Sequence, residues 1–594
     1  MEKYGKFGPL LGVIQVSKIY AKFLVYAARN AEILTYHEIT LKQIVPNASW
    51  LEYDPQEIVK SVKECIEIAC QNLIILEINP VDIVAVGLTT QRGTTVLWDR
   101  VSGEPLYNAI SWSDARSTDV LKGFLGKVKG NLNYLKSVCG LPLSTCFSAL
   151  KIKWLEENVP LVQQSVANKN CCFGTLDSWI LWNLTGSTDN GSHVTDVTNA
   201  GYTMLMNLHT QQWDRNLCSF FNLPKIILPE IRSNSEVYGY IQQGPLRGIP
   251  ISSSIGDQPA ALLGQLCTNV GQSLCTIDES CFVLLNTGEE IIDSESGLCS
   301  VAAFKLGEKG KCVYAVEGAI SNAGASITWL KDTLQINTEI NQNENTAEVL
   351  STFLGDNSMI SSACSSMGNL IGNGIDGNGG KKGELIFVPA FNGLYSPYWK
   401  YDARGLLLGL TSNTTSEHVT QAAYEATGFQ IKEILTSLHV DSPVWAPTKK
   451  LTIGGDYAEN NHFMQFISDI VGISIERPQS SSTSCLGAML AAGIAMNVVT
   501  IESAKHILTP PCDNFYPTTT PNRREILYRR WNYAVKKCLN WNNFATFTED
   551  VEDFNRREKD ANLPIRQSIP CSIFLTSAFV LFLVARYLQN PNVG

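Results

Sequence analysis

Short runs rich in valine and isoleucine alternate with longer helical stretches along this chain, and the alternation starts again in its second half. In the first half, residues 81–88 predict a buried strand, and residues 55–73 predict the helix before it. In the second half, the same patterns predict strands at 384–388 and 450–453 and helices near 418–438 and 461–471. The chain is therefore predicted to be an α/β protein built from two α/β halves.

The length of 594 residues also favours two large domains, because a single hydrophobic core rarely serves so long a chain. We expect the first domain to span residues 1–264 and the second to span residues 265–545. Within the second domain, residues 368–383 are rich in glycine, asparagine and lysine, which predicts a surface loop insertion.

The end of the chain carries an apolar segment behind a polar linker. Residues 546–568 are polar and charged, and residues 569–585 are nearly uncharged and close to the shortest length that crosses a bilayer. Arg566 and Arg586 flank this segment. A terminal helix packed on the core is the alternative, but the segment has no polar face to turn toward water. We therefore expect a C-terminal transmembrane anchor.

Charge and cysteine usage argue against some classes of function. The net charge of −10 argues against nucleic acid as a partner, because phosphate backbones require a basic surface. The 17 cysteines show no framework spacing, which fits unpaired thiols in a reducing compartment. No histidine and cysteine cluster has the spacing of zinc ligands, so we predict no metal site of that kind.

Several segments resemble those of one enzyme family. Residues 142–154 resemble the first signature of the FGGY carbohydrate kinases, except at Cys146, where the family has a tyrosine. The other similar segments are 405–410 and 418–425, which resemble the second signature, and 173–179, 195–200 and 387–391, which resemble glycerol kinases in particular. The chain thus resembles the glycerol-phosphorylating branch of this family over residues 12–541.

The resemblance implies a fold, a reaction and a location. It implies two actin-like ATPase domains, which are ribonuclease H-like, around a central cleft where glycerol or a similar small polyol meets Mg-ATP. It also allows a homo-oligomer. The apolar tail resembles that of animal glycerol kinases on the mitochondrial outer membrane, which implies a tail-anchored protein with its body in the cytosol. A cytoplasmic protein is the alternative.

On the polyol side, the resemblance assigns Asp257 as the catalytic base and Arg92, Trp112, Gln258 and Phe282 as substrate contacts. Phosphoryl transfer needs a carboxylate that accepts the hydroxyl proton and groups that position the substrate. Without the resemblance, Asp257 would be read as a turn or helix-capping residue, and Arg92 as a surface arginine that ends a strand.

Two polyol contacts of the family are missing. Gly93 stands where the family has a glutamate that accepts a glycerol hydroxyl, and Cys146 replaces a tyrosine hydroxyl. Each lost hydrogen bond costs about 0.5–1.5 kcal/mol, and about 3 kcal/mol if it is charged. We expect Gly93→Glu and Cys146→Tyr to rebuild these contacts.

The first nucleotide loop departs from the family at all four positions of its turn, where Val16 also replaces a glutamine. Gln15, Ser17 and Lys18 replace residues of an Asp-Gln-Gly-Thr turn whose aspartate helps to place magnesium and whose backbone binds phosphate. Serine at 17 would be strained if this turn needs a positive φ. Lys18 or Lys22 could still attract phosphate as point charges.

The second and third loops carry acidic residues instead of glycines and small residues. Asp278, Glu279 and Ser280 stand where the family has Gly-Thr-Gly, and Asp456 replaces a glycine near the adenosine. Like charges 4 Å apart repel by about 4 kcal/mol at an effective dielectric constant near 20. The alternative is that Asp278 and Glu279 hold an extra metal ion, since magnesium prefers carboxylates.

Three positions, Gly324, Gly455 and Asn460, still match nucleotide contacts of the family, although helix capping and tight packing would explain them equally simply. Two hypotheses follow. The chain is a membrane-tethered pseudokinase whose nucleotide site has degraded, or it is an active, divergent ATP:glycerol 3-phosphotransferase. Asp278, Glu279 and Asp456 favour the first hypothesis, and the catalytic-base position favours the second.

Overall fold

The computed structural model describes residues 5–336, 385–441, 450–479, 483–508 and 511–539. These residues belong to one compact unit that ends at Leu539. The predicted loop insertion at 368–383, the linker at 546–568 and the apolar segment at 569–585 lie outside the described residues. Within the described ranges, no helix is both long and apolar enough to cross a membrane.

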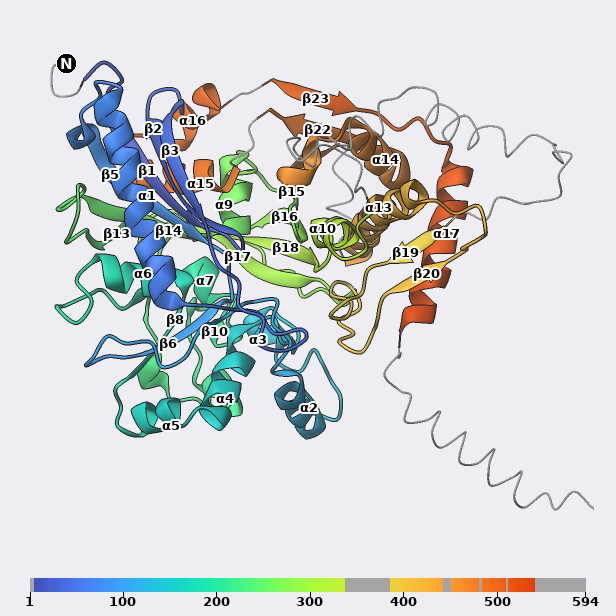
Figure 1. The fold of residues 1–594 in the computed structure, drawn as a ribbon, viewed down its shortest axis with the longest axis horizontal. Helices are drawn as coiled ribbons and strands as arrows, with labels where there is room; N and C mark the ends of the chain where they lie inside the picture. Colours follow the sequence, from blue (N-terminus) through green and yellow to red (C-terminus); the bar gives the residue numbers. More distant parts are fainter. Residues whose placement is uncertain (1–4, 337–384, 442–449, 480–482, 509–510, 540–594) are drawn as a thin grey trace, which may run out of the picture. The chain divides into compact units, whose positions relative to one another are not determined.

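The first large sheet has six strands in the order β13-β14-β5-β1-β2-β3 (Figure 1). Its inner strands β1, β5 and β14 run parallel, whereas β2 and β3 form antiparallel hairpins on one side. The predicted strand at 81–88 is confirmed but begins at Ile83, because Pro80 opens a short 3-10 turn before it. The strands are β1 Leu10–Val16, β2 Tyr20–Ala27, β3 Ile33–Thr40, β5 Ile83–Thr90, β13 Ser235–Tyr240 and β14 Pro250–Gly256.

The second large sheet has seven strands in the order β17-β18-β16-β15-β21-β22-β23. Strand β15 forms a hairpin with β16 and runs parallel to β21, and β21 runs parallel to β22. The first sheet has the same arrangement, because β1 forms a hairpin with β2 and runs parallel to β5, and β5 runs parallel to β14. The two sheets therefore share the same central strand pairing, to which the second sheet adds β17, and this confirms the predicted two α/β halves. The strands are β15 Ser273–Ile277, β16 Cys281–Gly288, β17 Cys299–Lys305, β18 Cys312–Ile320, β21 Lys450–Gly454, β22 Ser474–Pro478 and β23 Cys512–Phe515.

The predicted helices are also present. Helix α1, Pro55–Ile75, begins where the Asp54 side chain accepts hydrogen bonds from the N–H groups of Gln56 and Glu57, a standard N-cap. The other helices are α2 Thr118–Lys127, α3 Lys136–Cys139, α4 Ser148–Asn158, α5 Pro160–Ala167, α6 Leu176–Leu184, α7 Val197–Ala200, α8 Arg215–Phe220, α9 Asp257–Gly264, α10 Gly324–Asp332, α13 Ser416–Asp441, α14 Asn461–Val471, α15 Thr483–Ala495, α16 Ile501–Ile507 and α17 Pro521–Cys538.

Short strands complete the fold in four small sheets. They are β4 Glu52–Tyr53, β6 Thr95–Asp99, β7 Ala109–Ile110 and β8 Cys171–Thr175 in one sheet, β9 Val194–Asp196 with β12 Glu230–Arg232, β10 Met206–Asn207 with β11 Gln212–Trp213, and β19 Ile386–Val388 with β20 Leu406–Leu408.

Helix α15 comes from the second half of the chain but packs on the first sheet, against β14, β5 and β1, and along helix α9 (Figure 1). Glycines make this contact close. A Cβ atom on Gly487 would overlap the Ala260 carbonyl oxygen, and one on Gly264 would overlap the Thr483 carbonyl oxygen. The two helices therefore touch backbone to backbone, and α9, which begins with Asp257, is held between the two halves.

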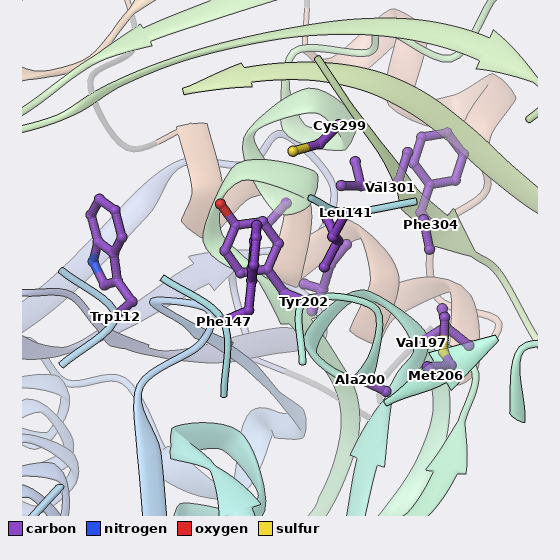
Figure 2. Packing of buried hydrophobic residues seen from close by; sticks show 14 of the residues in the cluster. Trp112, Leu141, Phe147, Val197, Ala200, Tyr202, Met206, Cys299, Val301 and Phe304 are labelled. Carbon is purple, nitrogen blue, oxygen red and sulfur yellow. The ribbon is translucent and has the colours of Figure 1, made fainter. Parts of the chain in front are cut away.

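The largest hydrophobic cluster also draws on both halves. Leu141 and Tyr202 come from the first half, and Val301 and Phe304 come from β17 of the second sheet. Figure 2 shows these side chains close together, and Trp112 belongs to the same cluster. Burial of each large apolar side chain contributes about 1.5–3 kcal/mol, so this shared cluster joins the two halves energetically.

We expect Gly487→Ala to lower the free energy of unfolding by about 3 kcal/mol, because the added methyl group has no room against the backbone of α9. The matched control is Gly123→Ala in the interior of α2, where a Cβ atom meets nothing within 4 Å. That change should stabilise the protein by about 0.5–1 kcal/mol. Urea unfolding of both variants measures the difference, and equal effects would contradict the close contact.

Candidate functional site

A cavity of about 350 Å³ lies where the β1–β2 turn, the β15–β16 turn and the start of α9 meet. Most predicted site residues line it: Gln15, Ser17, Lys18, Trp112, Asp257, Gln258, Asp278, Glu279, Ser280, Phe282, Gly455, Asp456 and Asn460. Arg92, Gly93, Cys146 and Gly324 lie next to these residues but do not line the cavity. The structure thus gathers polyol and nucleotide positions around one space.

Asp257 is the first residue of α9 and follows strand β14 directly. Its Oδ1 atom accepts the backbone N–H of Gln258 at 2.9 Å and lies 3.7 Å from Nε of Arg92. Burial raises the pKa of Asp257, and the nearby Arg92 charge opposes that rise. A carboxylate with a raised pKa is a better proton acceptor, so the geometry fits the role of a general base.

Arg92 is fully buried, and its main partner is a residue that the sequence reading missed. Its Nη2 atom donates to Oε2 of Glu317 at 2.7 Å, and its guanidinium lies 4.1 Å from the ring centre of Tyr202. Among the described residues, the Nε and Nη1 atoms of Arg92 and Oε1 of Glu317 have no hydrogen-bond partner. These buried atoms could bind the hydroxyl groups of a polyol. Arg92 is therefore not the surface arginine of the alternative reading.

The polyol contacts of the cavity lie between two aromatic rings. The ring centres of Trp112 and Phe282 are 5.7 Å apart. Two hydrogen bonds fix the orientation of the Gln258 side-chain amide. Its Nε2 atom donates to Asp257 at 3.3 Å, and its Oε1 atom accepts the hydroxyl of Thr276. The arrangement offers an apolar wall for a carbon chain next to polar groups that can bind its hydroxyls.

The backbone of this chain disfavours Gly93→Glu and Cys146→Tyr, and their effect on substrate contacts stays a prediction. Gly93 has a φ of +74°, where a glutamate would be strained, and its Cβ atom would lie 3.0 Å from the Cys146 carbonyl oxygen. Cys146 is 1% exposed, so its buried neighbours would have to move to admit a tyrosine. Burial raises the pKa of the Cys146 thiol, which lies beside Tyr395.

The first nucleotide loop uses its polar groups within the chain. Gln15 donates from Nε2 to Ser484 at 3.0 Å and accepts from the thiol of Cys485 at 3.0 Å. The Ser17 hydroxyl accepts the N–H groups of Ile19 and Tyr20 at 3.2 and 3.1 Å. Ser17 does not adopt a left-handed φ, so the strain that its replacement of glycine suggested does not arise.

The second loop, between β15 and β16, also binds the chain itself. Oδ1 of Asp278 accepts the backbone N–H of Asp456 at 2.9 Å. Oε1 of Glu279 accepts the hydroxyl of Thr328 at 3.0 Å and that of Tyr457 at 3.4 Å. Burial, and then the charge of Asp456, raise the pKa of Asp278 to about 7. These carboxylates therefore connect the second loop to the third loop and to α10.

The remaining nucleotide positions make packing and capping contacts. Gly455 has a φ of +103°, and its Cβ atom would lie 2.7 Å from Oδ1 of Asp278. Gly324 lies directly against the ring of Tyr457. The Asn460 side chain caps α14 by accepting the N–H of Phe463 at 3.0 Å, while its Nδ2 atom is buried without a partner among the described residues. Their nucleotide-binding role stays a prediction.

The lysines of the first loop offset the acidic residues only in part, because Lys22 lowers the pKa of Asp456 but burial still raises it. Lys22 pairs with Glu38 at 2.8 Å, and burial lowers the pKa of Lys18 although Glu279 opposes this. Within the described ranges, no group of three or more histidine, cysteine or acidic side chains could hold a metal ion. Ser17 and Lys22 are already bonded within the chain and carboxylates line the cavity, so the side chains of these loops do not fit the phosphate groups of Mg-ATP.

Comparisons with known proteins identify the family. Residues 18–264 match the N-terminal domain of the FGGY family of carbohydrate kinases, and residues 273–496 match its C-terminal domain. The chain is 35% identical over 573 residues to "Probable glycerol kinase" of Dictyostelium discoideum, covering 90% of this chain and 99% of that protein. It is 37% identical over 533 residues to "Glycerol kinase" of Brucella anthropi, covering 89% and 99%.

A solved structure agrees with these relatives. The crystal structure of Plasmodium falciparum glycerol kinase with ADP aligns with a TM-score of 0.73 and 31% identity, covering 90% of this chain and 99% of that one. The chain belongs to the FGGY family of carbohydrate kinases. Its fold is the mixed α/β, two-domain, actin-like ATPase type of this family, as the sequence predicted.

We expect Glu317→Ala to lower the free energy of unfolding by about 3–5 kcal/mol, because it leaves the buried Arg92 charge without its partner. The control is Glu289→Ala, which breaks the exposed pair between Lys311 and Glu289 and should cost less than about 1 kcal/mol. Denaturant unfolding compares the two variants. Equal losses would mean that Glu317 does not neutralise Arg92.

Proposed function

We propose that this protein is a glycerol kinase-like pseudokinase that binds a small polyol and has lost, or nearly lost, ATP-dependent phosphoryl transfer. One observation carries the proposal. At four of the replaced positions in the loops around the cavity, Gln15, Ser17, Asp278 and Glu279, the side chain is already bonded within the chain.

Repulsion between negative charges also disfavours binding of a nucleotide. A phosphate entering the cavity would approach Asp278, Glu279 and Asp456, while Lys22 is already paired with Glu38. A repulsion of about 4 kcal/mol for one pair of like charges corresponds to more than a hundredfold in affinity, because each 1.4 kcal/mol is a factor of ten. The phosphate would also have to displace Asp278 from the N–H of Asp456.

The polyol side supports retained ligand binding. Arg92 and Glu317 are buried and have hydrogen-bonding atoms without a partner among the described residues. The partly exposed Asp257 lies 3.7 Å from Arg92, and the rings of Trp112 and Phe282 are close by. The relatives named as glycerol kinases make glycerol, or a polyol of similar size, the first ligand to test.

An active ATP:glycerol 3-phosphotransferase is the second candidate. The observation that favours it is the position of Asp257, which starts α9 with a raised pKa and lies 3.7 Å from Arg92. In that case the loops would have to open before each nucleotide could bind.

The full-length protein is expected to bind Mg-ATP at least about a hundredfold more weakly than the Brucella anthropi relative, because the acidic loops repel phosphate. Calorimetry measures the affinity, and a glycerol-dependent assay for ADP measures turnover. Micromolar affinity together with turnover would establish the second candidate instead.

A variant in which the loop residues are changed to those of the family provides the positive control for that experiment. Six changes remove the acidic residues and restore the loops: Gln15→Asp, Ser17→Gly, Asp278→Gly, Glu279→Thr, Ser280→Gly and Asp456→Gly. This variant should bind Mg-ATP more tightly than the natural chain, whereas Gly93→Glu with Cys146→Tyr should not. No gain from the six changes would show that the acidic loops are not what limits binding.

We also propose that residues 569–585 anchor the protein in a membrane, with the mitochondrial outer membrane as the first candidate and the body in the cytosol. A fluorescent protein fused to Thr548–Gly594 should then localise to that membrane in cells. Replacing two apolar residues of the segment with aspartate should release the fusion, because charges are costly in a bilayer. A fusion that stays diffuse would support a cytoplasmic protein.

A further inference from the structure

The cavity contains a buried hydrogen-bond acceptor without a partner in the part of the chain that the structure describes. Gln91 lines the cavity and is 2% exposed. Its Nε2 atom donates to the Ser17 carbonyl oxygen at 3.2 Å, which fixes the orientation of the amide, and Oε1 has no partner among the described residues. A buried acceptor without a partner is unfavourable, so the site calls for a ligand that donates a hydrogen bond.

The charge of the cavity points to the same kind of ligand. Asp257, Asp278, Glu279 and Asp456 all line it, and the charges of the other three raise the pKa of Asp278. Lys22 is paired with Glu38, and burial opposes the charged form of Lys18. The cavity therefore holds more negative than positive charge, and a bound cation would relieve the repulsion.

The walls of the cavity suit an organic cation better than a metal ion. Trp112, Tyr20, Tyr424, Tyr457 and Phe282 line it, and aromatic faces attract ammonium groups. No set of three metal-ligating side chains exists in the part of the chain that the structure describes. Asn460 adds a buried Nδ2 donor without a partner, which could bind a hydroxyl oxygen.

We propose that the cavity binds a small hydroxylated primary amine, with its ammonium group between Asp257 and Asp278 and its hydroxyls near Gln91 and Asn460. The proposal rests on the proposed function, because it requires that a nucleotide is not the ligand of this space. It identifies the acidic loop residues as a cation site rather than as a damaged phosphate site.

The test compares two probes of nearly equal shape. Calorimetry on the full-length protein at neutral pH titrates 3-amino-1,2-propanediol, whose amine is protonated, and glycerol, which has a hydroxyl in place of that amine. The expected result is that the amine binds at least about tenfold more tightly than glycerol, and that added salt reduces this preference. Equal affinities, or no binding of the amine, would overturn the proposal.

Two variants locate the cation site. Asp278→Asn with Glu279→Gln should bring the two affinities within about threefold of each other, whereas the control Glu289→Gln at the exposed pair should leave the preference unchanged. Glu279→Gln alone should give an intermediate ratio and guards against misfolding of the double variant. An unchanged ratio in both cavity variants would overturn the proposal.

The amine proposal and the proposed function can fail independently of each other, because different measurements test them. The Mg-ATP titration reports whether the nucleotide site survives, and the ratio of amine to glycerol affinity reports the ligand class in the absence of nucleotide. Weak Mg-ATP binding with equal probe affinities would refute only the amine proposal, and tight Mg-ATP binding would refute the proposed function.

Discussion

The backbone contact between α9 and α15 is the constraint on which the site depends. Gly264 and Gly487 allow the two helices to touch without side chains between them. Because α15 lies between β22 and β23 of the second sheet in sequence but packs on the first sheet, this contact ties the two halves of the chain together. Asp257 is the first residue of α9, so the same contact fixes the carboxylate that faces the cavity.

The loops around the cavity form a second, polar system. Asp278 binds the backbone of the third loop, Glu279 binds Thr328 and Tyr457, and the Ser17 hydroxyl closes the β1–β2 turn. Buried polar groups are costly unless they are bonded, and here the chain supplies the partners itself. A scaffold that satisfies these groups internally can keep its fold without a nucleotide. The structure therefore explains how the loops could diverge while the two sheets stayed intact.

The sequence predicted the features that follow from local pattern. The strands β5 and β21 and the helices α1, α13 and α14 all appear in the structure. Periodicity and flanking residues report directly on such elements. The roles of the site residues remain predictions, since no ligand tests them.

Other features depend on distant neighbours and could not be read from local pattern. Glu317 is a lone acidic residue in the apolar strand β18, and only the fold reveals that it pairs with Arg92. The positive φ of Gly93 and the ordinary turn at Ser17 were equally hidden, because φ depends on how the chain packs around each residue. A charged residue within an apolar strand was the one signal that could have pointed to Glu317.

The hydrogen bond between Asp278 and the third loop depends on the protonation state of the Asp278 carboxyl. Its pKa rises from the ordinary 3.8 to about 7, so between these values the folded chain retains a proton that the unfolded chain releases. This carboxyl therefore favours the folded state most at acidic pH, and its contribution to stability falls as the pH rises from about 4 to about 7. Near neutral pH, the hydrogen bond that joins the second and third loops is thus formed by a group that is partly protonated, which makes the connection between them responsive to small changes in acidity.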